Sequence, residues 1–492
     1  MASKFGDFCV EKESKFPMKN KIILIIINII ILLSYFGLAD ASFTIEDERK
    51  LGKEFYENLE KNKILYHNMR VEEYITKLGM IIVSTIPKSP FEYHFSIIKS
   101  SAVNAFATPG GYVYVNLGLI NLVENESELA SVLAHETAHV NARHIADIVD
   151  KSTKVNIATL AALLAGAFLG GGDMTAAVAS FSMATATTLN LKYSREHEEE
   201  ADRLGMSYMA KAGYDVSSML DFLRIMRQTE YYSSNIPSYF LTHPGTDERI
   251  RYIDALLQTR YERGGSKSQI GQLKRIQISI MFELKNPDVN LKYFTAALEK
   301  KGEDVDYLYG LAVTQEKLGM IRQALENFHR ALKLAPDDME ILQNLGIAYF
   351  KNGRPAEAII YLGKAAEIEE SNATAAFYLG KAYEAQGNYR AALEIYKDLE
   401  KKNPDDVDVH YGLASAYGKT DKLGESHYHF GIYFKKLNKR SSALFHFREA
   451  LKYFPPGSSQ AKDIESQIKT RKTENEEAGK SRKVEFINLL RR

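Results

Sequence analysis

Hydrophobic and polar residues follow different patterns in different parts of the chain, and each pattern predicts a different kind of structure. A mostly apolar run occupies residues 22–39. Apolar and polar positions then alternate over residues 101–123, which predicts a β-hairpin that turns at a Pro-Gly-Gly sequence. Helical spacing follows over residues 125–150 and returns in the C-terminal half. We therefore expect a mainly helical protein that contains one small sheet.

The apolar run near the start has the composition of a secretory signal sequence. Two lysines precede it, and the small residues Ala39 and Ala41 end it, so we expect cleavage after Ala41. The alternative is an uncleaved anchor, because about eighteen mostly apolar residues could just span a bilayer. Translation could also begin at Met18, directly before the lysines, in which case residues 1–17 are not translated. Either form predicts export, and we expect the protein in the periplasm.

A second apolar stretch, residues 155–191, is rich in Ala, Gly and Thr and is interrupted by three consecutive glycines. Small residues allow helices to approach one another closely, and the interruption leaves segments that are short for a membrane span. We expect closely packed helices here rather than insertion into a bilayer. Contact with a membrane is then peripheral at most.

The C-terminal half repeats with a period of 34 residues from Asp304 onward. Equivalent positions carry the same residue type in three successive repeats: Leu311, Leu345 and Leu379; Gly319, Gly353 and Gly387; Ala324, Ala358 and Ala392. Small residues where two helices touch are typical of tetratricopeptide repeats (TPRs), which stack as helical hairpins. We predict an α-solenoid over residues 270–458, followed by a charged helix or tail at residues 459–492.

Composition excludes several kinds of function. The 63 basic and 63 acidic residues cancel, so no overall charge favours nucleic acid or an anionic membrane as a partner. Cys9 is the only cysteine and lies in the leader. A mature chain without thiols excludes disulfides, zinc thiolates and a cysteine nucleophile. Any metal ion must therefore be held by histidine and carboxylate side chains.

An HExxH motif lies in the predicted helix of residues 125–150, with His135, Glu136 and His139 at its key positions. Residues four apart share one face of a helix, so both imidazoles can reach one ion while Glu136 points beside it. Two imidazoles, one carboxylate and an open position for water suit Zn²⁺. The motif predicts one zinc ion per chain, with Glu136 as the general base. Surface histidines on an ordinary helix are the alternative, because short motifs also arise by chance.

Two places downstream could supply a third zinc ligand. A metzincin would have Gly and His where this chain has Ala142 and Ile145, and His144 is out of register, so we discard His144 as a ligand. An acidic segment with helical spacing, residues 193–205, offers several glutamates in the sequence YSREHEEEADRLG. One glutamate from a second helix beside HExxH is the gluzincin arrangement.

At these motifs the chain resembles a known family, the zinc peptidases that include HtpX and the CAAX prenyl proteases. The family pairs HExxH with a later EAD, here HETAH and Glu200-Ala201-Asp202. The resemblance covers roughly residues 45–255, including NAFATPGGYVYVNLGLI and THPGTDERI. With the signal sequence and the repeats, the whole chain is similar to the periplasmic group of β-barrel assembly-enhancing (BepA-like) proteases. HtpX and the prenyl proteases span the membrane several times, and the lack of such spans here favours the periplasmic group.

The resemblance implies roles for several residues. It makes Glu200 the third zinc ligand, and it supports His243 and Arg249 as catalytic residues that stabilise the developing oxyanion. A histidine before proline can instead be structural, and His243 in the open zinc position would leave the enzyme inhibited at rest. Asp202 lies two residues beyond Glu200 and off its helical face, so we expect an outer supporting role. The strand near residues 104–108 could pair with an extended substrate, or be an ordinary core strand.

We divide the 492 residues into a leader (1–41), a zincin-like α+β metallopeptidase domain with a small sheet (42–262), the TPR domain (270–458) and the tail. The resemblance implies a periplasmic zinc endopeptidase that cleaves misfolded or stalled outer-membrane and envelope proteins. It also implies that the TPR array docks these unfolded clients or the outer-membrane β-barrel assembly machinery. The alternative is a TPR chaperone or scaffold whose zinc site stays closed.

Overall fold

In the computed structural model the described residues are 43–151, 157–169, 192–232, 238–261 and 264–469. The chain divides into two compact units, Met1–Ile276 and Gln277–Arg492. The expected signal sequence, residues 170–191 of the second apolar stretch and most of the charged tail lie outside the described residues. Among the helices that are described, none is long and apolar enough to cross a membrane.

The N-terminal unit contains a three-stranded sheet with the order β1-β3-β2. Its strands are β1 (His94–Ile98), β2 (Ala105–Thr108) and β3 (Tyr112–Asn116). β3 pairs parallel to β1 and antiparallel to β2, with Phe106 opposite Tyr114. The predicted hairpin is thus confirmed as β2–β3. Its turn contains Gly110 and Gly111 at φ angles of 87° and 103°, a region that residues with a Cβ rarely adopt.

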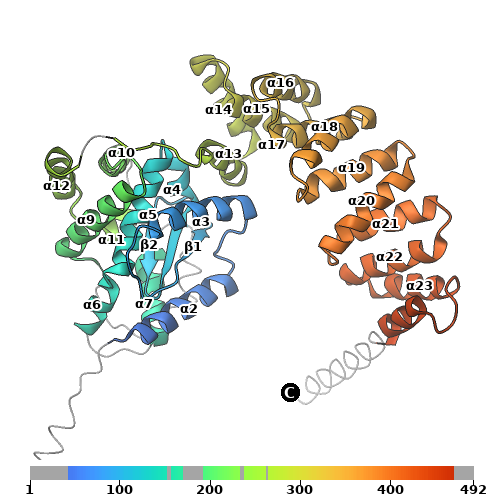
Figure 1. Ribbon diagram of the computed structural model, residues 1–492, viewed down its shortest axis with the longest axis horizontal. Helices are drawn as coiled ribbons and strands as arrows, with labels where there is room; N and C mark the ends of the chain where they lie inside the picture. The colour runs from blue at the N-terminus through green and yellow to red at the C-terminus, as the bar shows by residue number, and fades with distance from the viewer. Residues whose placement is uncertain (1–42, 152–156, 170–191, 233–237, 262–263, 470–492) are drawn as a thin grey trace, which may run out of the picture. The chain divides into compact units, whose positions relative to one another are not determined.

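Helix α5 (Glu126–Asn141) lies at the centre of this unit (Figure 1). It packs on β2 and β3 and, among other helices, on α3 (Met69–Val83), α9 (Arg195–Lys211) and α10 (Ser218–Tyr232). Every residue of α5 before Asn141 is buried. This explains why apolar residues surround the HExxH motif in the sequence, since the helix that carries it is surrounded by other elements.

The other helices that the structure describes in this unit complete its core. They are α2 (Ile45–Lys61), α4 (Leu117–Leu122), α6 (His144–Asp150), α7 (Ile157–Leu169), α11 (Ser238–Thr242) and α12 (Thr246–Thr259). Helices α2 and α7 pack together, with Phe55, Leu160 and Phe168 in one hydrophobic core. The described part of the second apolar stretch therefore forms a packed helix, as expected from its small residues.

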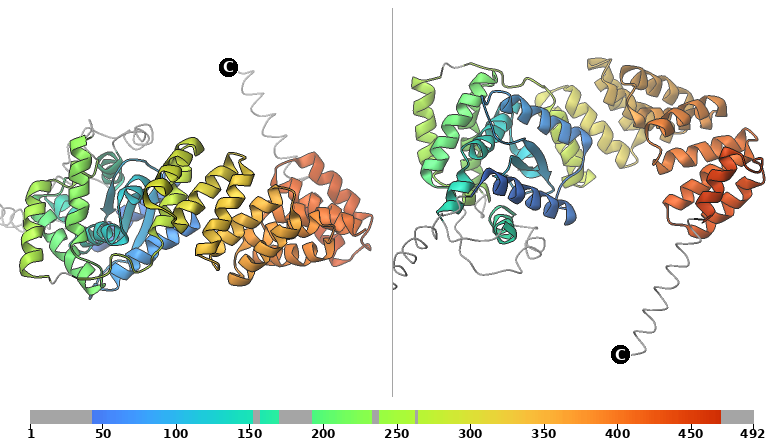
Figure 2. Two further views of the ribbon diagram at one scale, coloured as in Figure 1. Left: turned by 90° about the horizontal axis from the view of Figure 1, so that it is seen from above. Right: turned by 60° about the horizontal axis from the view of Figure 1, so that its bottom comes forward.

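The C-terminal unit is an array of helical hairpins, shown from two further sides in Figure 2. After α13 (Leu273–Leu284), which spans the boundary between the units, come α14 (Pro287–Lys301), α15 (Val305–Lys317), α16 (Ile321–Leu334), α17 (Met339–Lys351), α18 (Pro355–Ile368), α19 (Ala373–Ala385), α20 (Tyr389–Lys402), α21 (Val407–Lys419), α22 (Leu423–Lys436) and α23 (Arg440–Leu451). A Cβ atom added to Gly346 or Gly380 would lie 2.6 Å from Leu362 or Tyr396, respectively. This close approach explains the small residues repeated in the sequence and confirms the predicted α-solenoid.

Candidate metal centre

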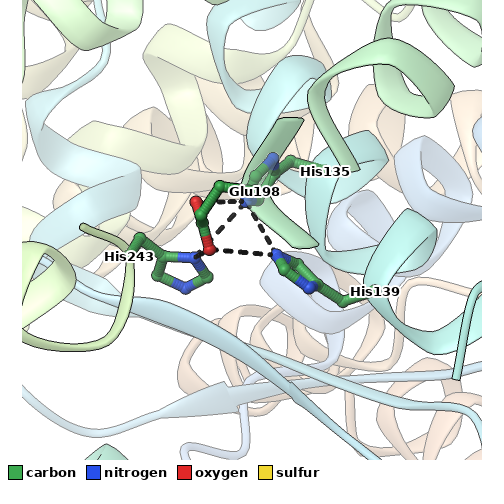
Figure 3. A group of neighbouring side chains, drawn as sticks. All are labelled: His135, His139, Glu198 and His243. Atoms are coloured by element: carbon green, nitrogen blue, oxygen red, sulfur yellow. Dashed lines mark hydrogen bonds and ion pairs between the residues drawn. The ribbon is translucent and has the colours of Figure 1, made fainter. Parts of the chain in front are cut away.

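Two histidines of α5, a glutamate of α9 and a histidine from the loop before α12 meet inside the N-terminal unit (Figure 3). They are His135, His139, Glu198 and His243, and none is more than 2% exposed. Nε2 of His135 lies 3.0 Å from Nε2 of His139 and 3.3 Å from Nδ1 of His243. Oε1 of Glu198 lies 3.0 Å from Nδ1 of His243 and 3.5 Å from Nε2 of His139.

These separations fit a bound zinc ion. Ligand atoms about 2.0–2.1 Å from an ion at the centre of a tetrahedron lie about 3.3 Å apart. Burial lowers the pKa of His139 well below its usual value, which favours the neutral imidazole that a metal binds. Although burial alone would raise it, the pKa of Glu198 is held well below its usual value by His243 and Arg249. His139 therefore offers a neutral imidazole and Glu198 an ionised carboxylate. Despite burial and the nearby Arg249, hydrogen bonds to Asp202 and Glu198 raise the pKa of His135 to about 9, so a metal ion would have to displace the proton of its Nε2.

The carboxylate in this group belongs to Glu198, so the assignment of Glu200 as the third ligand is corrected. The side chain of Glu200 is 51% exposed, and its carboxylate lies 3.3 Å from Nε2 of His144. Two residues along a helix turn the side-chain direction by about 200°, so Glu198 and Glu200 point to opposite sides of α9. The spacing of four between Glu198 and Asp202 is the sequence signal that could have identified the correct residue, because it places two carboxylates on one helix face.

Asp202 and Arg249 lie directly behind the group. Nδ1 of His135 donates a hydrogen bond to Oδ1 of Asp202 at 2.9 Å, which leaves the lone pair of Nε2 facing the centre. Nε and Nη2 of Arg249 bind the Asp202 carboxylate at 2.8 and 2.6 Å, and Nη1 lies 2.6 Å from Oε2 of Glu198. Asp202 thus lies where we expected an outer residue. Arg249 is thus bound to the carboxylates of both Glu198 and Asp202, a geometry that favours positioning over stabilisation of an oxyanion.

A second outer contact supports His139. Its Nδ1 lies 2.8 Å from Nδ1 of His144, and Nε2 of His144 reaches the carboxylate of Glu200. His139 can therefore donate to His144, which in turn donates to Glu200, and Nε2 of His139 keeps its lone pair toward the centre. Tyr193 stacks on the other side of the His139 ring, with centroids 3.8 Å apart. The sequence reasoning missed both His144 and Tyr193 as supports.

Glu136 lies beside the group and is completely buried. Its Oε1 is 3.5 Å from Nε2 of His243. Within the described part of the chain, neither oxygen of Glu136 nor Nε2 of His243 has a hydrogen-bond partner. Buried polar atoms normally have one, so a bound water or substrate fits this position. Burial raises the pKa of the Glu136 carboxyl, which brings the group closer to the range suited to proton transfer.

A small cavity adjoins the group where β2 ends. Thr108, His139 and Tyr193 are among the residues that line it. β2 is an edge strand of the sheet, and an extended peptide can bind such an edge through main-chain hydrogen bonds. All four side chains of β2 are buried. Pairing of a substrate with the main chain of residues 104–108 remains a prediction.

Comparison with known families agrees with this geometry. Residues 67–257 match the family described as Peptidase family M48. Residues 314–376 and 349–416 match two families described as tetratricopeptide repeat. The peptidase match includes all three strands and every residue of the metal-binding group.

Several known proteins are similar to part of this chain. The putative beta-barrel assembly-enhancing protease of Vibrio cholerae is 34% identical over 215 residues, which cover 43% of this chain and 44% of that protein. The beta-barrel assembly-enhancing protease of Escherichia coli K12 is 31% identical over 214 residues, with the same two coverages. The mitochondrial metalloendopeptidase OMA1 of Schizosaccharomyces pombe is 31% identical over 184 residues, covering 37% of this chain and 52% of that protein. The matches thus span only about half the length of these relatives.

The repeat array is also similar to solved structures. One is titled "Crystal structure of YrrB: a TPR protein with an unusual peptide-binding site". It is 17% identical, covers 40% of this chain and 97% of that chain, and has a TM-score of 0.32. A TM-score this low adds nothing to the argument from the repeat pattern.

Proposed function

We propose that the chain is a zinc-dependent metalloendopeptidase and that residues 67–257, which match Peptidase family M48, form its catalytic domain. The observation that carries the proposal is the convergence of His135, His139 and Glu198 from two helices, with Glu136 beside them. His–His–Glu with a neighbouring carboxylate is the donor set of a hydrolytic zinc site. The repeat array then belongs to the same polypeptide as an accessory binding unit.

The residues of the chain account for the steps of peptide hydrolysis. A zinc ion bound by the group would acidify a water molecule and polarise the substrate carbonyl. Glu136 takes the proton of that water as general base and passes it to the leaving amine. Asp202 and His144 hold the two imidazoles in the orientation and tautomer that the ion requires, and Arg249 holds Glu198.

His243 controls access to the centre in this proposal. Together with the other three donors it would complete a tetrahedral set, which leaves no position for water. His243 lies on the loop between α11 and α12, and its ring stacks on Tyr239 with centroids 4.4 Å apart. With an ion held by all four residues the site would be closed at rest, and catalysis would require the loop that carries His243 to move and leave a position for water.

The experiment that tests the activity is to replace Glu136 with Gln in the full chain. The Gln side chain cannot accept the proton, so casein cleavage should fall by about 100- to 10,000-fold. Zinc content should stay at the wild-type value, because Glu136 is not one of the ligands. Glu196→Gln, on the exposed side of α9, is the matched control and should retain both the zinc content and the casein cleavage of the wild type. Wild-type cleavage by Glu136→Gln would refute the proposed mechanism.

The closed donor set also favours a second function, that of a scaffold whose zinc site stays shut. His243→Ala distinguishes the two functions. If His243 is a removable fourth ligand, the variant keeps zinc and cleaves casein faster than wild type. If the chain is only a scaffold, neither protein cleaves casein, and Glu136→Gln supports every cellular function of the wild type.

We further propose that the substrates are misfolded or stalled envelope proteins in the periplasm, and that the TPR array docks them or the β-barrel assembly machinery. The names of the bacterial relatives and the N-terminal signal pattern support this assignment. Release of the mature protein by osmotic shock would agree with it, and retention in the cytoplasm would contradict it.

A further inference from the structure

A second group of metal-binding residues lies in the repeat array, in the other unit of the chain. Glu400 is on α20, His410 on α21 and His429 on α22. Nδ1 of His410 lies 3.2 Å from Nδ1 of His429. Oε1 of Glu400 lies 3.7 Å from Nδ1 of His410 and 3.6 Å from Nδ1 of His429. Both histidines are buried, whereas Glu400 is 31% exposed. The group is therefore enclosed by protein but reachable from solvent at Glu400.

The repeats themselves show that these residue types are unusual at these positions. One repeat earlier, the equivalent residues are Ala366, Ala376 and Ile395; two repeats earlier they are Leu332, Leu342 and Tyr361. In the repeat two before, the side chains of Leu332, Leu342 and Tyr361 belong to one hydrophobic cluster. Three helices that elsewhere meet through apolar contacts thus meet here through two imidazoles and a carboxylate. Polar groups in a packed position need a partner that apolar residues do not.

The hydrogen bonding of His410 leaves its inner nitrogen available. Nε2 lies 2.9 Å from the carbonyl oxygen of Pro404, which can only accept, so Nε2 carries the proton. In the neutral ring Nδ1 then presents its lone pair to the group. Burial, with His410 and Lys397 nearby, lowers the pKa of His429 to about 3. This favours the neutral imidazole at His429, the form in which an imidazole binds metal.

The three atoms are spaced as zinc ligands require. A point equidistant from Nδ1 of His410, Nδ1 of His429 and Oε1 of Glu400 lies about 2.0 Å from each, which matches the usual Zn–N and Zn–O distances. We propose that these residues bind one divalent transition-metal ion, Zn²⁺ in the first instance, that joins three consecutive helices of the array. Its role is structural, since an ion bound only by the folded array stabilises it.

The competing explanation is a direct hydrogen bond from Nδ1–H of His429 to Nδ1 of His410, with no ion. The full chain carrying Glu198→Gln, which weakens the first centre, separates the two in a calorimetric titration with Zn²⁺ alone. The proposal predicts a second Zn²⁺ site for each chain besides the weakened first centre. Adding Glu400→Gln should weaken that site by at least about 100-fold, because it removes a direct ligand. Glu394→Gln, exposed on the same helix, is the matched control and should leave it unchanged.

Glu400 is chosen because it is partly exposed, so its replacement leaves the packing of the array intact. A circular dichroism melt of each variant checks that the repeats are folded. Absence of the second site in Glu198→Gln, or unchanged affinity in the double variant, would overturn the proposal. Unchanged affinity in the double variant would instead place zinc at another histidine pair, such as His427 and His446, whose Nδ1 atoms are 2.9 Å apart.

Discussion

At the scale of single residues, the metal centre depends on the balance of buried charge. Glu136, Glu198 and Asp202 place three carboxylates in a region that is at most 1% exposed, and Arg249 is the cation that contacts two of them. When all three carboxylates are ionised and the histidines are neutral, as in a metal-bound site, two negative charges are left unbalanced. Buried charge without a partner is very costly. A divalent cation at the histidines would balance these charges, which supports the metal site independently of the motif.

The direction of each α9 side chain gives the sharpest prediction at this scale. Glu198→Gln replaces a ligand, so zinc affinity should fall by at least about 100-fold and casein cleavage should be lost. Glu200→Gln should retain zinc, because that carboxylate is half exposed and reaches only His144. Zinc content measured after dialysis against a weak chelator decides whether Glu198 or Glu200 is the third ligand. Loss of zinc from Glu200→Gln with retention in Glu198→Gln would restore the assignment made from the sequence.

At the scale of elements, α5 is fixed in place at its start as well as at its motif. Glu126, in the first turn of α5, is 1% exposed. Its carboxylate accepts hydrogen bonds from the backbone N–H groups of residues 269–271 and from the hydroxyls of Tyr74 and Tyr214. Acidic groups are also favoured at a helix N-terminus. Glu126 therefore holds the segment that leads into α13 against the helix that carries HExxH.

Replacing Glu126 with Gln should destabilise the N-terminal unit. One amide oxygen cannot accept all five hydrogen bonds, so buried donors are left unpaired, at a cost of about 1–3 kcal/mol for each unsatisfied group. Urea unfolding followed by circular dichroism should show a lower free energy of unfolding by at least this amount. Glu57→Gln, exposed on α2, should change it by less than about 0.5 kcal/mol. Equal stability of the two variants would contradict the anchoring role.

At the scale of the whole molecule, each of the two units has its own core and its own candidate metal site. An ion that binds only the folded state at about 100 times its dissociation constant stabilises by about 2.7 kcal/mol. Removal of zinc by a chelator should therefore lower the unfolding temperature of both units in scanning calorimetry. In Glu198→Gln the shift should remain only for the C-terminal unit, and in Glu400→Gln only for the N-terminal unit. If the chelator still lowered the unfolding temperature of both units in both variants, the proposal of one separate zinc site in each unit would be refuted.

The sequence by itself determined the features that depend on local spacing. HExxH placed His135 and His139 on one helix face, the Pro-Gly-Gly turn predicted β2–β3, and the 34-residue period predicted the solenoid. Each follows from the periodicity of a helix or strand, which the chain carries in the order of its residues.

Only the tertiary structure decided which distant side chains meet. The acidic run of α9 offers four glutamates, and the packing of α9 on α5 selects Glu198 over Glu200. The enzyme hypothesis made from the sequence depends on Glu200 reaching His135 and His139; Glu200 does not reach them, and the hypothesis stands because Glu198 takes that place. The packing also brought His144 to His139, and Glu400 to His410 and His429. These contacts depend on how helices rotate and cross when their apolar faces are buried, and spacing along the chain does not contain that information.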